Sequence, residues 1–368
     1  MPDLLPNIKP DPDINRLLTV LRREGEPDRI PFFELFADQQ IIEAVLGEPL
    51  VPEGLEGEDA FWASQRNQVR FWHGLGYDFY CVRGAYDWPS LRRARTADTA
   101  ELSKGERAWV QQEGGVITRP EEFDEYPWPG PASQNMFDFV PQLQGELPDG
   151  MGLTWRLSGI LKNTMWLMGY EGISFALMDE PELVRKVVRK VADRAAELFS
   201  AALKHPEIRA VVLGEDMGFK TQTMLPPDVM REFIFPQQKR LVDMAHEKGV
   251  PFVLHSCGKL EAIMDDLIGF VGIDAKHSFE DVIETVVEAK AKYGERIAVL
   301  GGIDVDKLAR YDEADLRAYV RDTIQGAAPK GGYALGSGNS VANYVKVSNF
   351  LAMLEEGRTH GRYPLRGK

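Results

Sequence analysis

The 368-residue sequence has only two cysteines, Cys81 and Cys257, and they lie far apart in the chain. Two distant thiols do not build the disulfide framework of a small secreted domain, so a reducing, cytoplasmic location is expected. The sequence also lacks an apolar run long enough to span a membrane, and its start has no basic and then apolar leader. We therefore expect neither a membrane segment nor an export signal.

Basic residues are outnumbered in this chain. It has 43 Lys and Arg against 57 Asp and Glu, a net charge of −14. This balance argues against binding to a nucleic-acid backbone or to an anionic membrane surface. Hydrophobic residues make up 44% of the chain, which is enough for a large core. The expected partners are therefore small molecules or other proteins.

Short apolar stretches alternate with helical patterns along the whole chain, which predicts parallel strands joined by helices. Eight stretches that end in polar or glycine-rich loops are the predicted strands: 30–35, 78–82, 152–155, 210–213, 252–254, 272–277, 297–300 and 332–335. Eight strands, each followed by helix, match the count of a (β/α)8 TIM-type barrel. We predict one such α/β domain over residues 1–368.

The segment 85–152 departs from this alternation. It is rich in proline and contains several of the tryptophans. Its pattern predicts a β-hairpin followed by a short helical stretch, inserted after the second strand. A filled barrel has no room for these tryptophans, so we expect the insertion to form a lid over the barrel mouth or a subunit interface.

A His-Ser-Cys-Gly motif follows directly on the predicted strand 252–254. Residues two apart in extended chain project to the same side, so His255 and Cys257 can converge just past the strand's carboxyl end. An imidazole and a thiolate together suit zinc. The alternative is a hydrogen-bonded histidine beside a small buried thiol. The position at a strand end favours the metal site, because barrels carry their chemistry there.

Other strand-end residues allow two interpretations each. His277 is either a general acid or base, or a loop histidine bonded to Glu280 or Asp281. Asp304 is either a catalytic group or a helix N-cap.

Two basic residues are candidate contacts for an anionic group of the substrate. Arg156 follows Trp155 on the third predicted strand, where it can reach a ligand at the strand end. Lys220 lies in the loop after the fourth predicted strand, and it either binds such a group or pairs with Glu215.

Several motifs together resemble the uroporphyrinogen decarboxylase superfamily. They are Gly-Glu-Asp-Met-Gly-Phe-Lys at 214–220, Leu-Pro-Pro-Asp at 225–228, His-Ser-Cys-Gly at 255–258, Gly-Gly-Ile-Asp at 301–304 and Gly-Gly-Tyr-Ala-Leu-Gly at 331–336. The resemblance implies a TIM-type barrel with one of two chemistries. One is metal-free decarboxylation of uroporphyrinogen. The other is zinc-dependent methyl transfer between corrinoid proteins and a thiol or related acceptor.

The chain departs from the decarboxylase pattern at three strand ends. The stretch 31–38 carries Glu34 and Asp38 where decarboxylases have an arginine motif for substrate carboxylates. Arg83 stands near the position of their pyrrole-binding aspartate, and Asn339 near that of their histidine. The remaining alternative of this kind is a decarboxylase-like enzyme acting on a smaller carboxylated substrate.

The methyltransferase branch matches better. The resemblance implies a zinc site whose ligands in that branch are a His-x-Cys pair and a later cysteine. The pair corresponds to His255 and Cys257 here, and the position of the later cysteine aligns on Asn339. Glu215 or Asp216, one strand earlier, is the expected third ligand. Such a set is harder than His/Cys/Cys, so it favours an oxygen or nitrogen acceptor, or a methoxy donor, over a thiol.

The resulting hypothesis is a zinc-assisted methyltransferase that moves a methyl group between a corrinoid protein and a small molecule. Its expected partners are that substrate, the corrinoid protein and a second copy of the chain. Its expected site residues divide into metal ligands (His255, Cys257, Glu215), catalytic groups (Glu215, His277, Asp304) and substrate contacts (Glu34, Arg83, Arg156, Lys220, Asn339). A barrel that binds a ligand or a corrinoid protein without catalysis is the third alternative.

Overall fold

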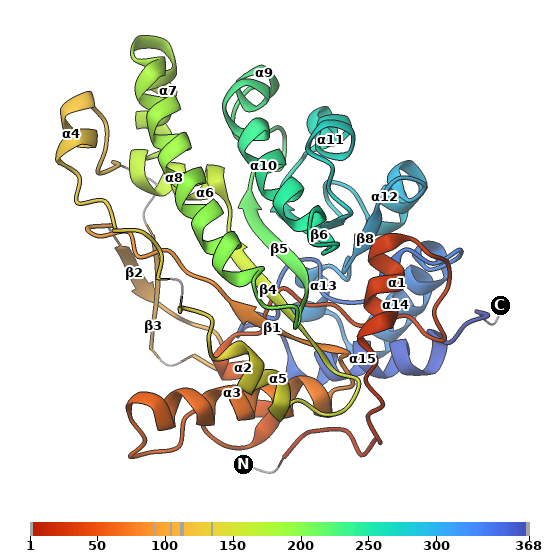
Figure 1. Ribbon diagram of the computed structural model, residues 1–368. Helices are drawn as coiled ribbons and strands as arrows, with labels where there is room; N and C mark the ends of the chain where they lie inside the picture. Colours follow the sequence, from red (N-terminus) through yellow and green to blue (C-terminus); the bar gives the residue numbers. More distant parts are fainter. Residues whose placement is uncertain (1–2, 92, 104, 111–113, 134, 366–368) are drawn as a thin grey trace.

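Seven parallel strands form one curled sheet in the computed structural model, which describes residues 3–91, 93–103, 105–110, 114–133 and 135–365 (Figure 1). The strands follow one another in the sheet in chain order, with helices packed outside. They are β1 (Phe79–Arg83), β4 (Gly152–Ser158), β5 (Ile208–Asp216), β6 (Phe252–Cys257), β7 (Ala275–His277), β8 (Ala298–Leu300) and β9 (Tyr333–Ala334). All their carboxyl ends therefore lie at the same edge of the sheet.

The stretch predicted as the first strand pairs only locally. Phe32 and Ala37 form isolated parallel bridges to Leu335 and Val341, and the Phe33 N–H donates to the Leu335 carbonyl at 2.8 Å. On its other side, the Phe33 ring lies 5.6 Å from the ring of Phe79 in β1, measured between centroids. The segment 30–37 thus lies between β1 and β9, the two edge strands of the seven-stranded sheet.

Helices cover the outer face of the sheet. They are α2 (Gln39–Leu46), α3 (Gly57–Gly74), α6 (Ile160–Met168), α7 (Tyr170–Asp179), α8 (Pro181–Ala202), α12 (Val286–Tyr293), α13 (Val305–Arg310), α14 (Glu313–Ala327) and α15 (Val347–His360). The first helix, α1 (Ile14–Arg22), does not belong to this outer layer. The connection after β6 is a succession of short turns, η2 (Glu261–Ile263), α11 (Met264–Asp266) and η3 (Leu267–Val271). Within the described ranges, no helix combines the length and the apolar character needed to cross a membrane.

The helical segment 227–246 is divided into three pieces. They are α9 (Pro227–Val229), a π-helical turn η1 (Met230–Ile234) and α10 (Phe235–His246). The cause is Pro236, which has no N–H to donate to the preceding turn. The Phe235 N–H instead bonds to the Met230 carbonyl, five residues back.

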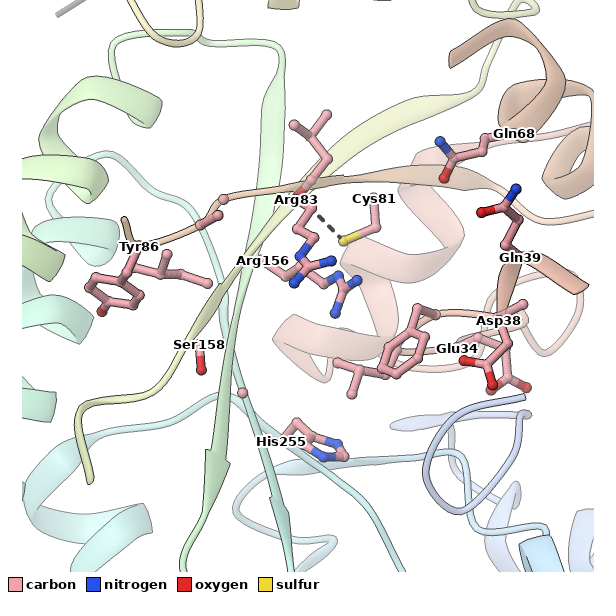
Figure 2. Close-up of a pocket in the computed structure, with 18 of the residues that line it drawn as sticks. Glu34, Asp38, Gln39, Gln68, Cys81, Arg83, Tyr86, Arg156, Ser158 and His255 are labelled. Atoms are coloured by element: carbon pink, nitrogen blue, oxygen red, sulfur yellow. Dashed lines mark hydrogen bonds between the residues drawn. The ribbon is translucent and has the colours of Figure 1, made fainter. Parts of the chain in front are cut away.

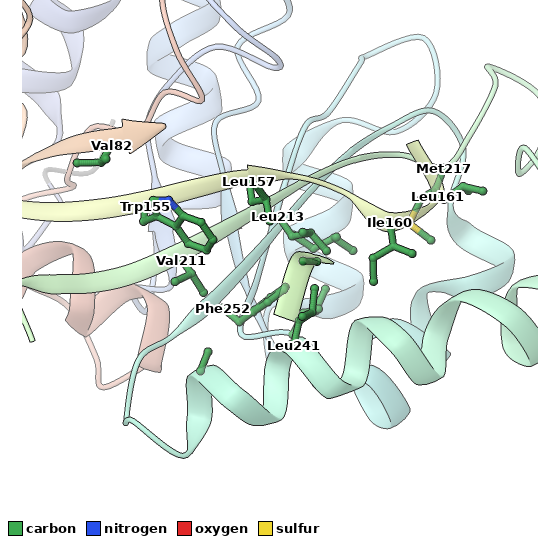
Figure 3. Close-up of a cluster of buried hydrophobic side chains, with 14 of the residues drawn as sticks. Val82, Trp155, Leu157, Ile160, Leu161, Val211, Leu213, Met217, Leu241 and Phe252 are labelled. Atoms are coloured by element: carbon green, nitrogen blue, oxygen red, sulfur yellow. The ribbon is translucent and has the colours of Figure 1, made fainter. Parts of the chain in front are cut away.

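Two apolar clusters fix the sheet. The larger lies between the strands and the outer helices, where Trp155, Leu213 and Phe252 meet Leu241 of α10 (Figure 3). The smaller fills the inside of the curled sheet with side chains from almost every strand, together with Phe33 and Leu35. Residues of α1, among them Leu17 and Leu21, belong to this inner cluster, so α1 closes the amino-terminal end of the strands.

The segment 85–152 contains a two-stranded antiparallel hairpin and two short helices. The strands are β2 (Arg93–Ala97) and β3 (Glu106–Val110), and the helices are α4 (Pro120–Glu125) and α5 (Val140–Glu146). The hairpin lies apart from the parallel sheet (Figure 1). Residues 92, 104, 111–113 and 134 of this segment lie outside the described residues. The remainder supplies side chains to the cavity described below.

Candidate active site

A cavity of about 1100 Å³ opens at the carboxyl ends of the parallel strands. Six of the residues predicted as site residues line it: Glu34, Arg83, Arg156, His255, Cys257 and Asn339. Figure 2 shows the first four of them around the cavity. Aromatic rings and the hairpin form much of the remaining wall, through residues such as Phe36, Tyr80, Trp88, Trp109 and Trp166. The cavity therefore combines aromatic walls with many polar and charged side chains, a lining that suits a polar or charged small molecule.

Strand register decides which residues face the cavity. In the β5–β6 pair, Gly214 lies beside His255 and Asp216 beside Cys257. Side chains alternate between the two faces of a sheet, so Asp216 shares the inner face with His255 and Cys257. Glu215 points to the outer face. Accordingly, Asp216 lines the cavity and Glu215 does not.

Two histidines and the thiol form a directional chain of contacts. The His277 Nε2 lies 3.2 Å from the backbone carbonyl of Ser337, which can only accept, so Nε2 carries the proton. In a neutral ring the His277 Nδ1 is then a bare acceptor, and it lies 2.8 Å from the His255 Nδ1, which must donate. The His255 Nε2 is thus left with a free lone pair, 3.7 Å from the Cys257 Sγ.

Burial keeps both rings neutral. It lowers the pKa of His277 to about 3, and the pKa of His255 also falls well below its ordinary value through burial and the positive groups around it. His277 itself is fully buried and does not line the cavity. The structure therefore brings His277 next to His255, with its ring behind the cavity wall and bonded to neither Glu280 nor Asp281.

The Cys257 sulfur accepts from two further donors. Asn339 Nδ2 lies 3.2 Å from it, and the Ser278 hydroxyl lies 3.6 Å from it. Burial and the nearby Asp216 carboxylate nevertheless raise the pKa of the thiol. Without a cation the group is therefore a thiol, whose proton can point to the free lone pair of His255 Nε2.

The His255 and Cys257 donors suit two corners of a zinc tetrahedron. Zn–N and Zn–S bonds of roughly 2.0 and 2.3 Å place tetrahedral nitrogen and sulfur ligands about 3.6 Å apart. The observed separation of Nε2 and Sγ is 3.7 Å, and the nitrogen is in the tautomer that binds a metal. Across the described ranges, no group of three or more His, Cys, Asp or Glu side chains is arranged to hold a metal ion. The pair therefore fits zinc, while a third protein donor is not in position.

Glu215 is not brought into this site. Its carboxylate is fully buried and caps the start of α6, accepting from the Ile160, Leu161 and Lys162 N–H groups at 2.7, 3.2 and 3.1 Å. The Gln238 side chain donates to it at 2.9 Å. A carboxylate that compensates a helix N-terminus is structural here, because both of its oxygens are already occupied.

Asp304 and Lys220 also lie away from the cavity. Asp304 is the N-cap of α13, where its carboxylate accepts from the N–H groups of Asp306 at 2.9 Å and Lys307 at 3.3 Å. A second contact from the Asp281 N–H, 3.0 Å, fixes the neighbouring loop. Lys220 is exposed and does not line the cavity. The structure thus supports the helix-cap interpretation of Asp304.

Glu34 lies on the cavity wall as a buried acid. Ser337 donates to it twice, through its N–H at 2.7 Å and through its hydroxyl. Burial outweighs these donors and raises the pKa of Glu34 to about 8. A carboxyl group with this pKa is mostly protonated at neutral pH, so Glu34 can supply a proton.

Ser337 and Lys162 are site residues that the sequence analysis did not single out. Ser337 connects Glu34 to His277 through its two donors and its carbonyl. Its neighbour Gly301 has φ +79°, and a Cβ there would lie 2.3 Å from the Ser337 carbonyl oxygen. Only the Gly-Gly pair at 301–302 could have signalled this close packing. Lys162 of α6 lines the cavity one turn after the helix start, a position that needed the fold to be known.

One family profile matches the chain. The profile described as Uroporphyrinogen decarboxylase (URO-D) matches residues 109–360, more than half of the sequence. The match includes β4 to β9 and thus the strand ends that carry His255 and Cys257. No curated protein matches the chain.

Solved structures share the fold at low sequence identity. A methyltransferase from Methanosarcina mazei superposes with a TM-score of 0.67 at 14% identity, covering 95% of this chain and 99% of that one. A B12-independent methionine synthase from Shewanella sp. W3-18-1 gives a TM-score of 0.48 at 11% identity, with coverages of 90% and 95%. The first similarity shows a common fold, and the second is too weak to support an argument.

Proposed function

Because the chain belongs to the uroporphyrinogen decarboxylase family, we propose that it is a zinc-assisted methyltransferase with a closed (β/α)8 barrel. In this proposal a small molecule carrying a methylated oxygen or nitrogen donates the methyl group to a corrinoid protein. The segment 30–37 is taken as the first strand of the barrel, since it pairs with the chain after β9 and contacts β1 through Phe33.

The observation that carries the proposal is the orientation of His255 and Cys257. His277 holds the His255 ring so that its free Nε2 lone pair faces the Cys257 sulfur at 3.7 Å. A buried histidine with a purely structural role is expected to have both ring nitrogens in short hydrogen bonds, whereas the His255 Nε2 faces only the Cys257 sulfur. Metal-binding histidines commonly have such a partner, which orients the ring and sets its basicity.

His255 and Cys257 would hold the zinc, and Asp216, which lines the cavity beside Cys257, would have to turn toward it to serve as the proposed third donor. When bound, the metal acts as a Lewis acid that polarises the heteroatom carrying the methyl group. Asn339 and Ser278 donate to the Cys257 sulfur and fix its position. His277 keeps the His255 ring from turning, so the residues around the metal are organised before the substrate enters.

Glu34 is the proposed proton donor. The methyl–heteroatom bond would break while a reduced corrinoid acceptor supplies the electron pair for the new bond to the methyl carbon. The heteroatom would keep the pair of the broken bond and accept a proton from the Glu34 carboxyl group. The pKa of about 8 keeps this proton available at neutral pH. Ser337 holds the carboxyl group in place and stabilises the carboxylate that remains.

The hairpin and the cavity mouth define where a partner would act. Trp109 of β3 and Trp88 line the cavity, so we propose that the segment 85–152 is a lid that limits access of water. The corrinoid protein would have to approach at this mouth.

A cytoplasmic location is proposed from the two free thiols. We also propose that two copies of the chain form a homodimer.

A decarboxylase-like carboxy-lyase is the alternative. The observation that favours it is that Arg83 and Arg156 line the cavity, since arginine is the side chain suited to a substrate carboxylate. Release of carbon dioxide without any need for zinc would identify it.

The test is a methyl-transfer assay with free, reduced cobalamin as the acceptor and a panel of methoxylated and methylated-amine small molecules. Zinc-loaded protein is expected to methylate the corrinoid, as followed by its absorption spectrum, and Cys257→Ser should abolish the reaction. Asn339→Ala, which keeps both proposed ligands, should retain a measurable rate. Transfer that is equally fast without zinc and in Cys257→Ser would overturn the proposal.

A further inference from the structure

Arg83 and Arg156 stand side by side at the cavity wall. They are register partners in the parallel pair of β1 and β4, and both lie at or near the carboxyl ends of their strands. Figure 2 shows the two guanidinium groups next to each other, between the strands and the side of the cavity that holds His255. Two positive groups on adjacent strands repel each other, and Arg83 together with burial lowers the pKa of Arg156.

Neither arginine has a carboxylate partner within ion-pair distance in the described part of the chain. The Arg156 guanidinium instead lies over the Phe36 ring, 4.7 Å from its centroid. Arg156 is half-buried, and Arg83 is exposed to the cavity solvent. Burying an unpaired charge costs free energy, and placing a like charge beside it adds to that cost.

The acids of the cavity are engaged elsewhere. Glu34 is bound to Ser337 and is mostly neutral, as described above. Asp38 accepts from the Asn343 N–H at 3.0 Å and lies 4.0 Å from Arg107 of the hairpin. Burial raises the pKa of Asp216, and the positive charge of Lys162 opposes that shift. In a chain with a net charge of −14, the two arginines are thus left for a ligand.

We propose that Arg83 and Arg156 form an anion subsite that binds an acidic group of the substrate, a carboxylate or a chemically related sulfonate or phosphate. The guanidinium forks match such oxygens through paired hydrogen bonds. The Phe36 ring, which Arg156 already contacts, offers a flat apolar surface for the body attached to that group. The reacting end of the molecule then lies toward His255 and Cys257; this orientation alone rests on the proposed function.

The binding test uses three anionic probes, benzoate, benzenesulfonate and phenyl phosphate, with benzamide as the uncharged counterpart. Calorimetry on the zinc-free full chain is expected to detect the anions and to find benzamide much weaker. Arg156→Met and Arg83→Met should each weaken benzoate binding by about tenfold to a hundredfold, the loss of charge-assisted hydrogen bonds. The relative affinities of the three anions identify the preferred acidic group.

Matched controls separate the subsite from general charge effects and from misfolding. Arg189→Met removes an exposed arginine on α8 and should leave benzoate binding unchanged. Arg156→Lys keeps the charge and should retain part of the affinity, and each variant is checked for a cooperative unfolding transition. Equal binding of benzoate and benzamide, or benzoate affinity unchanged in folded Arg156→Met and Arg83→Met, would overturn the subsite.

The same measurement in Cys257→Ser keeps this inference separate from methyl transfer. That variant should bind benzoate like the wild type, because the thiol lies outside the arginine pair. Benzoate binding in a protein that neither binds zinc nor transfers methyl groups would support the subsite while removing the proposed function. Loss of benzoate binding in folded Cys257→Ser would contradict the subsite as described.

Discussion

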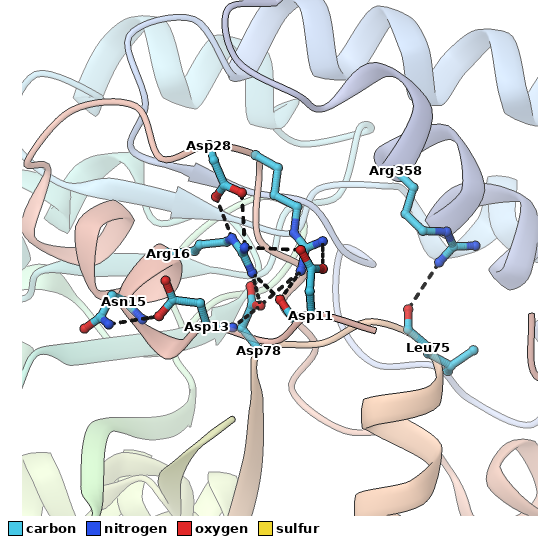
Figure 4. Close-up of polar contacts among 9 residues, drawn as sticks. Asp11, Asp13, Asn15, Arg16, Asp28, Leu75, Asp78 and Arg358 are labelled. Atoms are coloured by element: carbon cyan, nitrogen blue, oxygen red, sulfur yellow. Dashed lines mark hydrogen bonds and ion pairs between the residues drawn. The ribbon is translucent and has the colours of Figure 1, made fainter. Parts of the chain in front are cut away.

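Arginine side chains have opposite surroundings at the amino-terminal and carboxyl-terminal ends of the parallel strands. At the amino-terminal end, Arg16 and Arg29 are surrounded by Asp11, Asp28 and Asp78, with contacts from 2.5 to 3.6 Å (Figure 4). At the carboxyl-terminal end, Arg83 and Arg156 have no such partners within the described residues. The same side chain is thus neutralised by the protein at one end and left without a carboxylate partner at the other, where we propose the anion subsite.

This difference follows from what each end must do. Arg16 belongs to α1, which fills the amino-terminal opening of the sheet, and its ion pairs connect α1 to Asp28 and to the residue preceding β1, Asp78. Paired charges there hold the helix in position. The carboxyl end carries the cavity. In barrel folds, residues at the amino-terminal face generally serve stability, whereas residues at the carboxyl-terminal face serve binding and catalysis. We propose that the presence or absence of a carboxylate partner distinguishes structural arginines from ligand-binding ones in this protein.

The largest expected effect is on stability at the amino-terminal end. Arg16→Met leaves the buried Asp78 carboxylate with Arg29 alone and should lower the free energy of unfolding by about 3 kcal/mol. Arg156→Met removes an unpaired charge and should change it by no more than about 1 kcal/mol. Urea unfolding of both variants beside Arg189→Met measures the contrast. Equal destabilisation by Arg16→Met and Arg156→Met would break the comparison.

The next effect concerns Glu34, the buried acid of the cavity. Its pKa is about 8 in the folded protein against 4.5 for an unperturbed group, so the unfolded state releases the proton first as pH rises. Stability from this group is therefore full below about pH 4.5 and is lost up to about pH 8.

Between pH 5 and pH 7 the wild type should lose about 2 kcal/mol of unfolding free energy through Glu34, and Glu34→Gln should lose correspondingly less. Unfolding curves of the two proteins at both pH values give the difference, and the other titrating groups largely cancel in it. A Glu34→Gln protein with the same pH dependence as the wild type would show that Glu34 is ionised in the fold.

The smallest effect sharpens the division between structural and site residues. Asp304→Ala removes the N-cap of α13 and should cost about 1 kcal/mol of stability. Zinc affinity should stay the same, because Asp304 does not line the cavity. If Asp304→Ala lost zinc binding while its stability stayed unchanged, Asp304 would have to be a residue of the active site and not only a helix cap.

Much of this arrangement could be predicted from the sequence. The strand ends that carry His255 and Arg156 were recognisable as short apolar runs followed by polar residues, and the spacing of His255 and Cys257 implied that both face one side. The predicted first strand at 30–35 forms only isolated bridges, because its hydrogen bonds are divided between Gly361, which accepts from Ile30, and the chain around Leu335.

The choice between Glu215 and Asp216 required register. Adjacent residues on a strand point to opposite faces, and only the pairing of Asp216 with Cys257 shows which one faces inward. Likewise, His277 and Ser337 are 60 residues apart, and their contact depends on how β7 and the loop after β9 meet. Side-chain partnerships of this kind have no local sequence pattern.

The central claim is that His255 and Cys257 form a metal-binding pair, and calorimetry with zinc at neutral pH tests it most directly. The wild type is expected to bind one zinc ion per chain, whereas Cys257→Ser and His255→Ala should bind it far more weakly, because a hydroxyl or a methyl group replaces a strong ligand. Asp304→Ala serves as the folded control. No zinc binding by the wild type, or equal binding by folded Cys257→Ser, would contradict the account.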